Sequence, residues 1–220
     1  MSIVDKLPML GDSMLRVLII GNAPGEDLSQ WSNLVLDSDL IIACDGAMEK
    51  CQSNGIVVNV LIGDMDSISE PSQRYAESKR VKIIKQTDQN TNDLTKAISY
   101  ADSVGATKIS IINVDGGRSD HQFANYLSLL EAKSDARLLL NDCTVRALSN
   151  NKPISHSIEI GTEFSVFSLG QSSGINLAGG KWVLKNAVLE SNSTGLHNVA
   201  VEDVISIDCK TGNLLMFVSH

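Results

Sequence analysis

Between residues 16 and 142, apolar runs alternate with helical patterns, and this alternation constrains the fold more than any other feature of the chain. The runs contain consecutive β-branched and other apolar residues, and glycine or aspartate follows most of them. Continuous runs of this kind are typical of strands buried on both faces of a parallel sheet. We expect strands over residues 16–20, 40–44, 57–62, 81–84 and 109–112.

Two amphipathic helices are predicted between or after these strands. The first has one apolar stripe at i, i+3, i+4 and i+7 spacing, with Asn90 or Asn92 as its N-cap. That stripe consists of Leu94, Ala97, Ile98 and Ala101. The second helix has a stripe formed by Phe123, Leu127 and Leu130, preceded by an S-x-x-Q capping box at Ser119 and Gln122. Repeated strand–helix–strand order predicts an α/β domain with a Rossmann-like, mostly parallel sheet.

The pattern changes after about residue 144. Short, often alternating apolar segments follow, with glycine-rich or serine-rich turns between them, and the stretch 210–213 is typical of a hairpin connection. We therefore expect a small all-β sandwich after the α/β domain. The predicted boundaries are 1–144 for the α/β domain and 145–220 for the β domain.

Charge and cysteine content exclude several classes of protein. The net charge of −8 argues against nucleic-acid binding, which needs a basic surface. The four cysteines form no C-x-x-C pair, and Cys44 and Cys143 fall at the ends of apolar runs, as reduced thiols in a core do. Asp5 and Asp12 interrupt the N-terminal apolar residues, and no segment reaches the roughly 18 apolar residues that span a membrane. These features predict a cytoplasmic protein without a membrane partner.

Carboxylates recur where the predicted strands end or helices begin. They are Asp45, the pair Asp64 and Asp66, Asp93, and Asp120. An open α/β sheet places its ligand crevice at this edge, and Mg²⁺ takes one or two protein carboxylates and completes its shell with water and phosphate. The alternative for each cluster is structural, because aspartates also bond turn amides and complement helix dipoles. On that alternative Lys96, one turn after Asp93, would be only a solvated surface charge.

The segment 115–121 is the most specific local pattern after the D-x-D pair. Gly116 and Gly117 allow the backbone to approach a ligand, and Arg118 offers a planar fork for phosphate oxygens at the start of a helix. No P-loop and no G-x-G-x-x-G motif is found in the sequence. Phosphate binding by carboxylate-held metal and arginine is therefore the favoured interpretation.

These motifs, in this order, resemble the thiamin pyrophosphokinase family. The resemblance covers nearly the whole chain and rests on the following segments: Asp45-Gly46-Ala47, Gly63-Asp64-Met65-Asp66-Ser67, Asp88-Gln89 with Asp93 and Lys96-Ala97, Gly116-Gly117-Arg118 with Asp120-His121, Lys181-Trp182 with Leu184, and Ser191-Asn192.

The resemblance implies an ATP-dependent enzyme that pyrophosphorylates the hydroxyl of thiamin, acting as a homodimer with active sites between subunits. It implies Mg²⁺ ligands at Asp64, Asp66 and Asp93, and catalytic roles for Asp93, Arg118 and Asp120. ATP or its phosphates would be bound by Asp45, Gly46, Ser67, Lys96, Arg118 and His121. Thiamin would be bound by Gln89, Ser191 and Asn192. Either Asp120 or His121 would orient or deprotonate the thiamin hydroxyl, and the residue that stacks on the thiamin rings is left open.

Two other functions use part of the same pattern. A D-x-D glycosyltransferase would use the metal pair but leaves the segments around Arg118 and Ser191 unexplained. A non-catalytic nucleotide-binding module would tolerate loss of the carboxylates. Release of AMP from ATP in the presence of thiamin would discriminate among the three.

Overall fold

The structure is a computed structural model that describes residues 14–25, 27–66, 68–88, 90–149 and 152–220. The chain divides into two compact units, Met1–Ala136 and Arg137–His220. The division falls within β6 (Asp135–Leu139), a strand of alternating exposed charged and buried apolar residues through which the chain passes from one unit to the next. The sequence-based boundary after residue 144 stays a prediction.

The first unit is built on a parallel sheet with the strand order β4-β3-β2-β1-β5. In the register of the sheet, Val17 of β1 lies between Leu40 of β2 and Ile109 of β5. The strands are β1 (Arg16–Ile20), β2 (Leu40–Cys44), β3 (Val60–Gly63), β4 (Lys82–Lys85) and β5 (Lys108–Ile112). All five residues of β2 are buried, as expected for a central strand covered on both faces. The predicted α/β class is confirmed.

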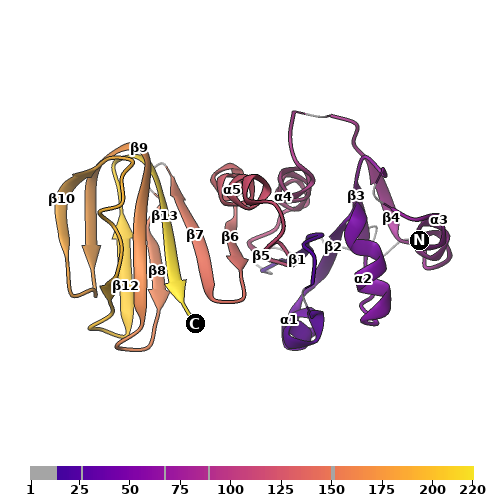
Figure 1. Ribbon diagram of the computed structural model, residues 1–220, viewed down its shortest axis with the longest axis horizontal. Coiled ribbons are helices and arrows are strands. Elements are labelled where there is room, and N and C mark those ends of the chain that lie inside the picture. Colours follow the sequence, from indigo (N-terminus) through magenta and orange to yellow (C-terminus); the bar gives the residue numbers. More distant parts are fainter. Residues whose placement is uncertain (1–13, 26, 67, 89, 150–151) are drawn as a thin grey trace. The chain divides into compact units, whose positions relative to one another are not determined.

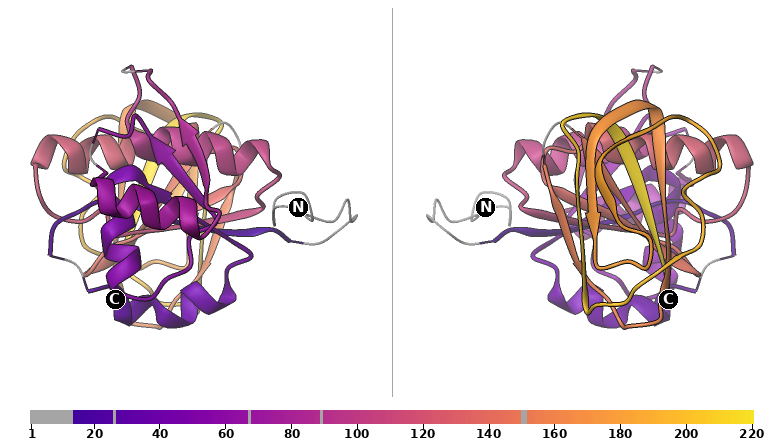
Figure 2. Two further views of the ribbon diagram at one scale, coloured as in Figure 1. Left: turned by 90° about the vertical axis from the view of Figure 1, so that its right-hand side faces the viewer. Right: turned by 90° about the vertical axis from the view of Figure 1, so that its left-hand side faces the viewer.

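Helices cover both faces of this sheet (Figures 1 and 2). Right-handed crossovers that step from β1 through β4 place the first three helices on one face. The next crossover returns across the sheet, so α4 packs over β1, β2 and β3 on the opposite face. The helices are α1 (Ser32–Asp37), α2 (Met48–Ser53), α3 (Glu70–Ser78), α4 (Asp93–Ser103) and α5 (Ser119–Ser128), with short 3-10 turns η2 (Leu28–Trp31), η3 (Asp45–Ala47) and η4 (Leu129–Glu131).

The third strand is shorter than predicted. It begins at Val60, and Val57 is 70% exposed. Asn59 precedes the strand, and its side-chain Oδ1 accepts a hydrogen bond from the Ile41 backbone N–H at 2.7 Å. The prediction that this strand starts at residue 57 was wrong.

The two helix predictions had different outcomes. In α4 the Asn92 side chain caps the helix by accepting from Thr95 N–H at 2.7 Å, and the predicted stripe is buried, which confirms both points. In α5 the helix begins at Ser119 itself, so no capping box forms there. Phe123 and Leu127 are 55% and 37% exposed in the single chain, so the prediction that this stripe is buried was wrong there. Periodicity identified the apolar face but not what covers it.

The second unit is all-β and antiparallel, as predicted. Its strands are β7 (Cys143–Ser149), β8 (Ile154–Ser157), β9 (Glu163–Ala178), β10 (Leu184–Leu189), β11 (Asn198–Val199), β12 (Val204–Asp208) and β13 (Thr211–Ser219). The long strand β9 pairs with β11 and β13 through its first half and with β10 and β12 through its second half. It therefore belongs to both layers of a small sandwich, whose shared core contains Phe164, Ile175 and Met216.

The connection at residues 210–213 is not a hairpin. The strands before and after it, β12 and β13, both pair with β9 and, within the part of the chain that the structure describes, not with each other. The connection passes from one layer to the other, and Gly212 there has a positive φ of 96°. A hairpin turn and a connection between layers have the same local residue composition, so the sequence alone did not distinguish them.

Candidate active site

A pocket of about 810 Å³ lies in the first unit at the carboxyl ends of the strands. Strands β1 and β5 are neighbours, but the chain leaves β1 toward α1 and leaves β5 toward α5, on the other face of the sheet. This is the topological switch point, where open α/β sheets bind ligands. The lining includes residues 21–24 after β1, Cys44 and Asp45 after β2, Asp64 after β3, residues 88 and 91–94 before and within α4 with Lys96, and residues 114, 116–118, 120, 121, 124 and 125 around the start of α5.

Asp45 connects the ends of β2 and β3 at one wall of this pocket. Its side chain is buried, and its two oxygens accept from Gly46 N–H at 2.6 Å and from Met65 N–H at 3.0 Å. A Cβ atom at Gly63 would lie only 2.7 to 2.8 Å from the Asp45 carboxyl group. Glycine at the end of β3 is therefore required for the two acidic segments to approach each other.

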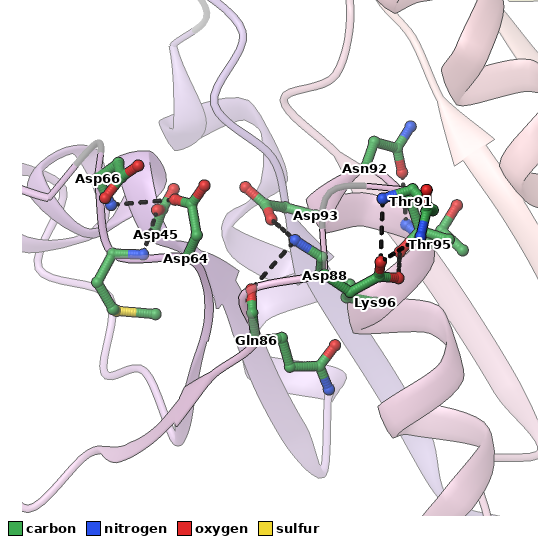
Figure 3. Close-up of polar contacts among 12 residues, drawn as sticks. Asp45, Asp64, Asp66, Gln86, Asp88, Thr91, Asn92, Asp93, Thr95 and Lys96 are labelled. Atoms are coloured by element: carbon green, nitrogen blue, oxygen red, sulfur yellow. Dashed lines mark hydrogen bonds and ion pairs between the residues drawn. The ribbon is translucent and has the colours of Figure 1, made fainter.

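The D-x-D pair forms a tight turn beside Asp45 (Figure 3). Asp64 lines the pocket, and one of its oxygens accepts from Asp66 N–H at 3.0 Å. That backbone hydrogen bond is the main reason that the pKa of Asp64 is lowered. Asp66 is exposed, and Ser67 lies outside the described residues. The turn interpretation and the metal interpretation both fit this geometry, because a carboxylate has about four lone-pair positions and the hydrogen bond from Asp66 occupies one of them.

The first turn of α4 carries an ion pair that faces the same space. Lys96 Nζ lies 3.0 Å from Asp93 Oδ1 and donates to Gln86 O at 3.3 Å (Figure 3). The Lys96 side chain is only 6% exposed, so the interpretation of this lysine as a solvated surface charge was wrong. Asp93 is 32% exposed on the pocket side.

The loop before α4 is ordered by Asp88. Its carboxylate accepts from Asn90 N–H at 3.0 Å and from the Thr91 hydroxyl at 3.2 Å, and the first of these bonds is the main cause of its lowered pKa. Asp88 also lines the pocket. Gln89, expected to contact thiamin, lies outside the described residues.

The start of α5 carries a second ion pair. Arg118 donates through Nε and Nη2 to the two oxygens of Asp120, at 3.1 and 2.6 Å. This fork is the main reason that the pKa of Asp120 falls to about 2. His121 donates its backbone N–H to the same carboxylate at 3.0 Å and lines the pocket with both charged residues. The planar donor geometry expected of Arg118 is therefore present, with a carboxylate in the place where phosphate oxygens were predicted.

Two residues of this region were missed in the sequence. Asn113, fully buried and with a φ of 56°, donates its side-chain amide to Gly21 O, and Lys50 donates to Ala23 O and to Asn113 Oδ1. Together they hold the loop after β1 against the end of β5. An asparagine directly after an apolar strand was the one available signal, since Asn tolerates left-handed backbone.

The expected thiamin residues of the second unit form a polar turn after β10. Ser191 Oγ accepts from Gly170 N–H at 2.7 Å and donates to Ser168 O at 3.1 Å. Asn192 Oδ1 accepts from Thr194 N–H at 3.0 Å. Both residues are exposed. The side-chain amide nitrogen of Asn192 is one donor that this exposed turn presents.

Among the described residues, no three or more His, Cys, Asp or Glu side chains gather where they could hold a metal ion together. No helix in the described ranges is long and apolar enough to cross a membrane. The pocket nevertheless has an excess of negative charge, with five lining carboxylates against Lys96 and Arg118.

The fold and this pocket together define an α/β protein with a candidate ligand site at the topological switch point of its sheet. The family model described as "Thiamin pyrophosphokinase, catalytic domain" matches residues 31–140. The chain belongs to the thiamin pyrophosphokinase family, as the sequence motifs predicted.

Individual relatives agree with this assignment. The chain is similar to thiamine pyrophosphokinase of Saccharomyces cerevisiae, with 46% identity over 41 residues that cover 19% of this chain and 13% of the relative. It is 25% identical over 131 residues to thiamine pyrophosphokinase of Bacillus subtilis, covering 59% of this chain and 61% of the relative. The chain thus matches less than two thirds of the length of either curated relative. The crystal structure of the Bacillus subtilis enzyme has the same fold, with a TM-score of 0.80 and 20% identity over 93% of this chain and 98% of that one.

Proposed function

We propose that this protein transfers a pyrophosphoryl group from ATP to the hydroxyl of thiamin, giving thiamin diphosphate and AMP. The observation that carries the proposal is the convergence of four separate motif segments on one switch-point pocket. Those segments contribute Asp45, Asp64, the pair Asp93 and Lys96, and the pair Arg118 and Asp120. The family match supports the same activity and does not favour a glycosyltransferase.

The charge of the pocket supports a requirement for Mg²⁺. Five carboxylates and two cationic side chains line it, so an ATP polyphosphate would be repelled without added positive charge. Mg²⁺ is held by one or two carboxylates and by substrate phosphates, which fits a pocket without a three-ligand protein cluster among its described residues. We propose that these one or two ligands come from Asp64, Asp66 and Asp93, of which Asp64 and Asp93 line the pocket together with Asp45. When bound, Mg²⁺ would neutralise charge on the phosphate oxygens.

The protein side chains would orient the transfer. The thiamin hydroxyl oxygen forms a bond to the β-phosphorus of ATP while the bond from that phosphorus to the α–β bridging oxygen breaks, and AMP leaves with the electron pair. Lys96 and Arg118 are the cations that line the pocket and are available to the phosphate oxygens. Gly46 and Ser67 complete the phosphate site in our proposal.

The hydroxyl proton must pass to a base. Asp120 has a pKa of about 2 and both of its oxygens are held by Arg118, so as observed it is a weak base and suits orientation of that arginine. His121 lines the same pocket, and both residues remain our candidates for the base.

We propose further that thiamin is bound between the subunits of a homodimer. Gln89 would contact it in the first unit, with Ser191 and Asn192 of the second unit completing the pocket of the other subunit. The Ser191 hydroxyl is already bonded to Gly170 and Ser168, which supports Asn192 as the main donor of this turn. The exposed apolar residues Phe123 and Leu127 of α5 provide a surface that a second subunit would cover.

Cysteine chemistry supports a cytoplasmic location. The four cysteines, all within the described residues, are thiols outside any disulfide, and burial raises the pKa of the Cys44 and Cys51 thiols, that of Cys51 to about 12. Such thiols are protonated and unreactive at neutral pH.

The activity is tested by incubating the protein with Mg-ATP and thiamin and separating the products by chromatography. We expect AMP and thiamin diphosphate in equal amounts, and no AMP when thiamin is omitted. Formation of ADP, or ATP hydrolysis that does not depend on thiamin, would contradict the proposal.

A further inference from the structure

A buried hydroxyl group connects the two helices that line the pocket. Ser128, near the C-terminal end of α5, is 2% exposed. Its Oγ accepts from Thr95 Oγ1 at 2.9 Å and from Asn92 Nδ2 at 3.2 Å, and donates to Ala124 O at 3.0 Å. A serine hydroxyl has one donor and two acceptor positions, so this group uses its full hydrogen-bonding capacity.

The same network fixes the first turn of α4. Asn92 caps the helix through its Oδ1, while its amide nitrogen reaches Ser128. Thr95, only 8% exposed, contributes its backbone N–H to the cap and its hydroxyl to Ser128. Asp93 lies between these two residues in the sequence and pairs with Lys96 at the pocket. The orientation of that ion pair therefore depends on how the turn is held.

On the other helix, Ser128 is held to the residues that line the pocket. Ala124, whose carbonyl accepts from Ser128, is itself in the lining, as is Asn125. Asn125 donates to Val114 O at 3.1 Å and thereby fixes α5 to the loop that leads to Arg118. The helix is a rigid connection from this anchor back to its first turn.

We propose that Ser128 and Thr95 are positioning residues that set the separation between the Asp93–Lys96 pair and the Arg118–Asp120 pair across the pocket. A buried polar network that is fully satisfied is rigid, and it specifies one packing of the two helices. Transfer between bound phosphates depends on such spacing, because a displacement of about 1 Å can cost about a hundredfold in rate. The inference rests on the proposed function and adds residues that do not touch the substrates.

The test compares variants that remove the two hydroxyls. Thr95→Val keeps the shape of the side chain, and Ser128→Ala removes the centre of the network. We expect each to lower kcat/KM for ATP by about tenfold or more. In the double variant, kcat/KM for ATP should be at most about twofold below that of the less active single variant, because both changes disrupt one network. Thr95→Ser retains the hydroxyl and should stay within about threefold of the wild type.

A matched control separates positioning from stability. Asp102, at the other end of α4, accepts from Lys133 N–H at 2.8 Å and from Ser134 N–H at 3.0 Å. Asp102→Asn should lower the melting temperature without changing kcat or KM. Affinity for a non-hydrolysable ATP analogue, measured by calorimetry, should fall in Thr95→Val and stay unchanged in Asp102→Asn.

The outcomes are distinct. A wild-type protein that does not act on thiamin would refute the proposed function, whereas the analogue affinities would still test the network. Thr95→Val and Ser128→Ala proteins with wild-type kinetics and analogue affinity would overturn the inference. Additive losses in the double variant, or an equal kinetic loss in Asp102→Asn, would overturn it as well.

Discussion

Replacing Lys96 with methionine tests whether the ion pair of α4 contributes to stability. Lys96 is 6% exposed, and its ammonium lies 3.0 Å from Asp93 and 3.3 Å from Gln86 O. Methionine retains an unbranched apolar side chain, so most of the packing of the lysine stem is preserved. The change therefore removes the charge and leaves the Asp93 carboxylate without its partner in a largely buried position.

The expected magnitude follows from these contacts. At 3.0 Å the attraction is about 5 kcal/mol for an effective dielectric constant of about 20, before the cost of desolvating both groups. Removing one partner of a fully buried pair costs about 3–5 kcal/mol. Asp93 is 32% exposed, so water screens the remaining charge, and we expect Lys96→Met to lower the free energy of unfolding by about 1–3 kcal/mol. Adding Asp93→Asn should recover about 1 kcal/mol of that loss, because the uncompensated charge is removed.

Urea unfolding followed by circular dichroism at 222 nm measures this effect, since all the described α-helices lie before residue 136. Arg74→Met is the matched control. Arg74 forms an exposed i,i+4 pair with Glu70, 69% and 84% exposed, so its replacement should change stability by less than about 0.5 kcal/mol. The Lys96–Asp93 pair does not stabilise the fold if Lys96→Met lowers the free energy of unfolding by no more than this control does. The same conclusion holds if adding Asp93→Asn to Lys96→Met recovers no stability.

Three further predictions concern the site. Asp64→Asn should lower turnover at least about a hundredfold at saturating Mg-ATP, because losing a ligand of the charge-stabilising metal raises the activation barrier by several kcal/mol. The circular dichroism spectrum should be unchanged, and near-normal turnover would remove Asp64 from the metal site. Arg118→Lys keeps the charge but loses the planar fork, so turnover should fall and the pKa of Asp120 should rise from about 2 toward its ordinary value of 3.8, as followed by NMR titration. The pKa of Asp120 is lower in the folded than in the unfolded protein, so its contribution to stability is present above the unfolded pKa and is lost as the pH falls through about 2. An Asp120 titration midpoint that is unchanged in Arg118→Lys would contradict this account. Mixing inactive Asp93→Ala and Asn192→Ala chains should restore part of the activity if sites are shared between subunits, and no recovery after demonstrated subunit exchange would place each site within one chain.

Agreement between sequence and structure is closest where the signal is local. The boundaries of β1 and β2, the cap at Asn92 and the buried stripe of α4 follow from residues adjacent in the sequence. The failures have a common cause. Val57, the stripe of α5 and the supposed hairpin near Gly212 all depended on which distant segment lies opposite, and composition does not encode that.

The sequence by itself determined the class of fold, because short β-branched apolar runs that end at Gly or Asp and alternate with amphipathic helices are typical of a parallel sheet covered on both faces. It also predicted that Asp45, Asp64, Asp93 and Asp120 would line one pocket, since the carboxyl ends of parallel strands share one edge. The predicted Asp66 is not in that lining, and Asp88 is there without having been predicted. Only the tertiary structure decided how these groups are paired. The burial of Lys96 against Asp93, the occupation of the Arg118 fork by Asp120 and the connection through Ser128 depend on distances between segments. Charge and hydrogen-bond energies change steeply with distance and burial, so residue identity alone does not fix them.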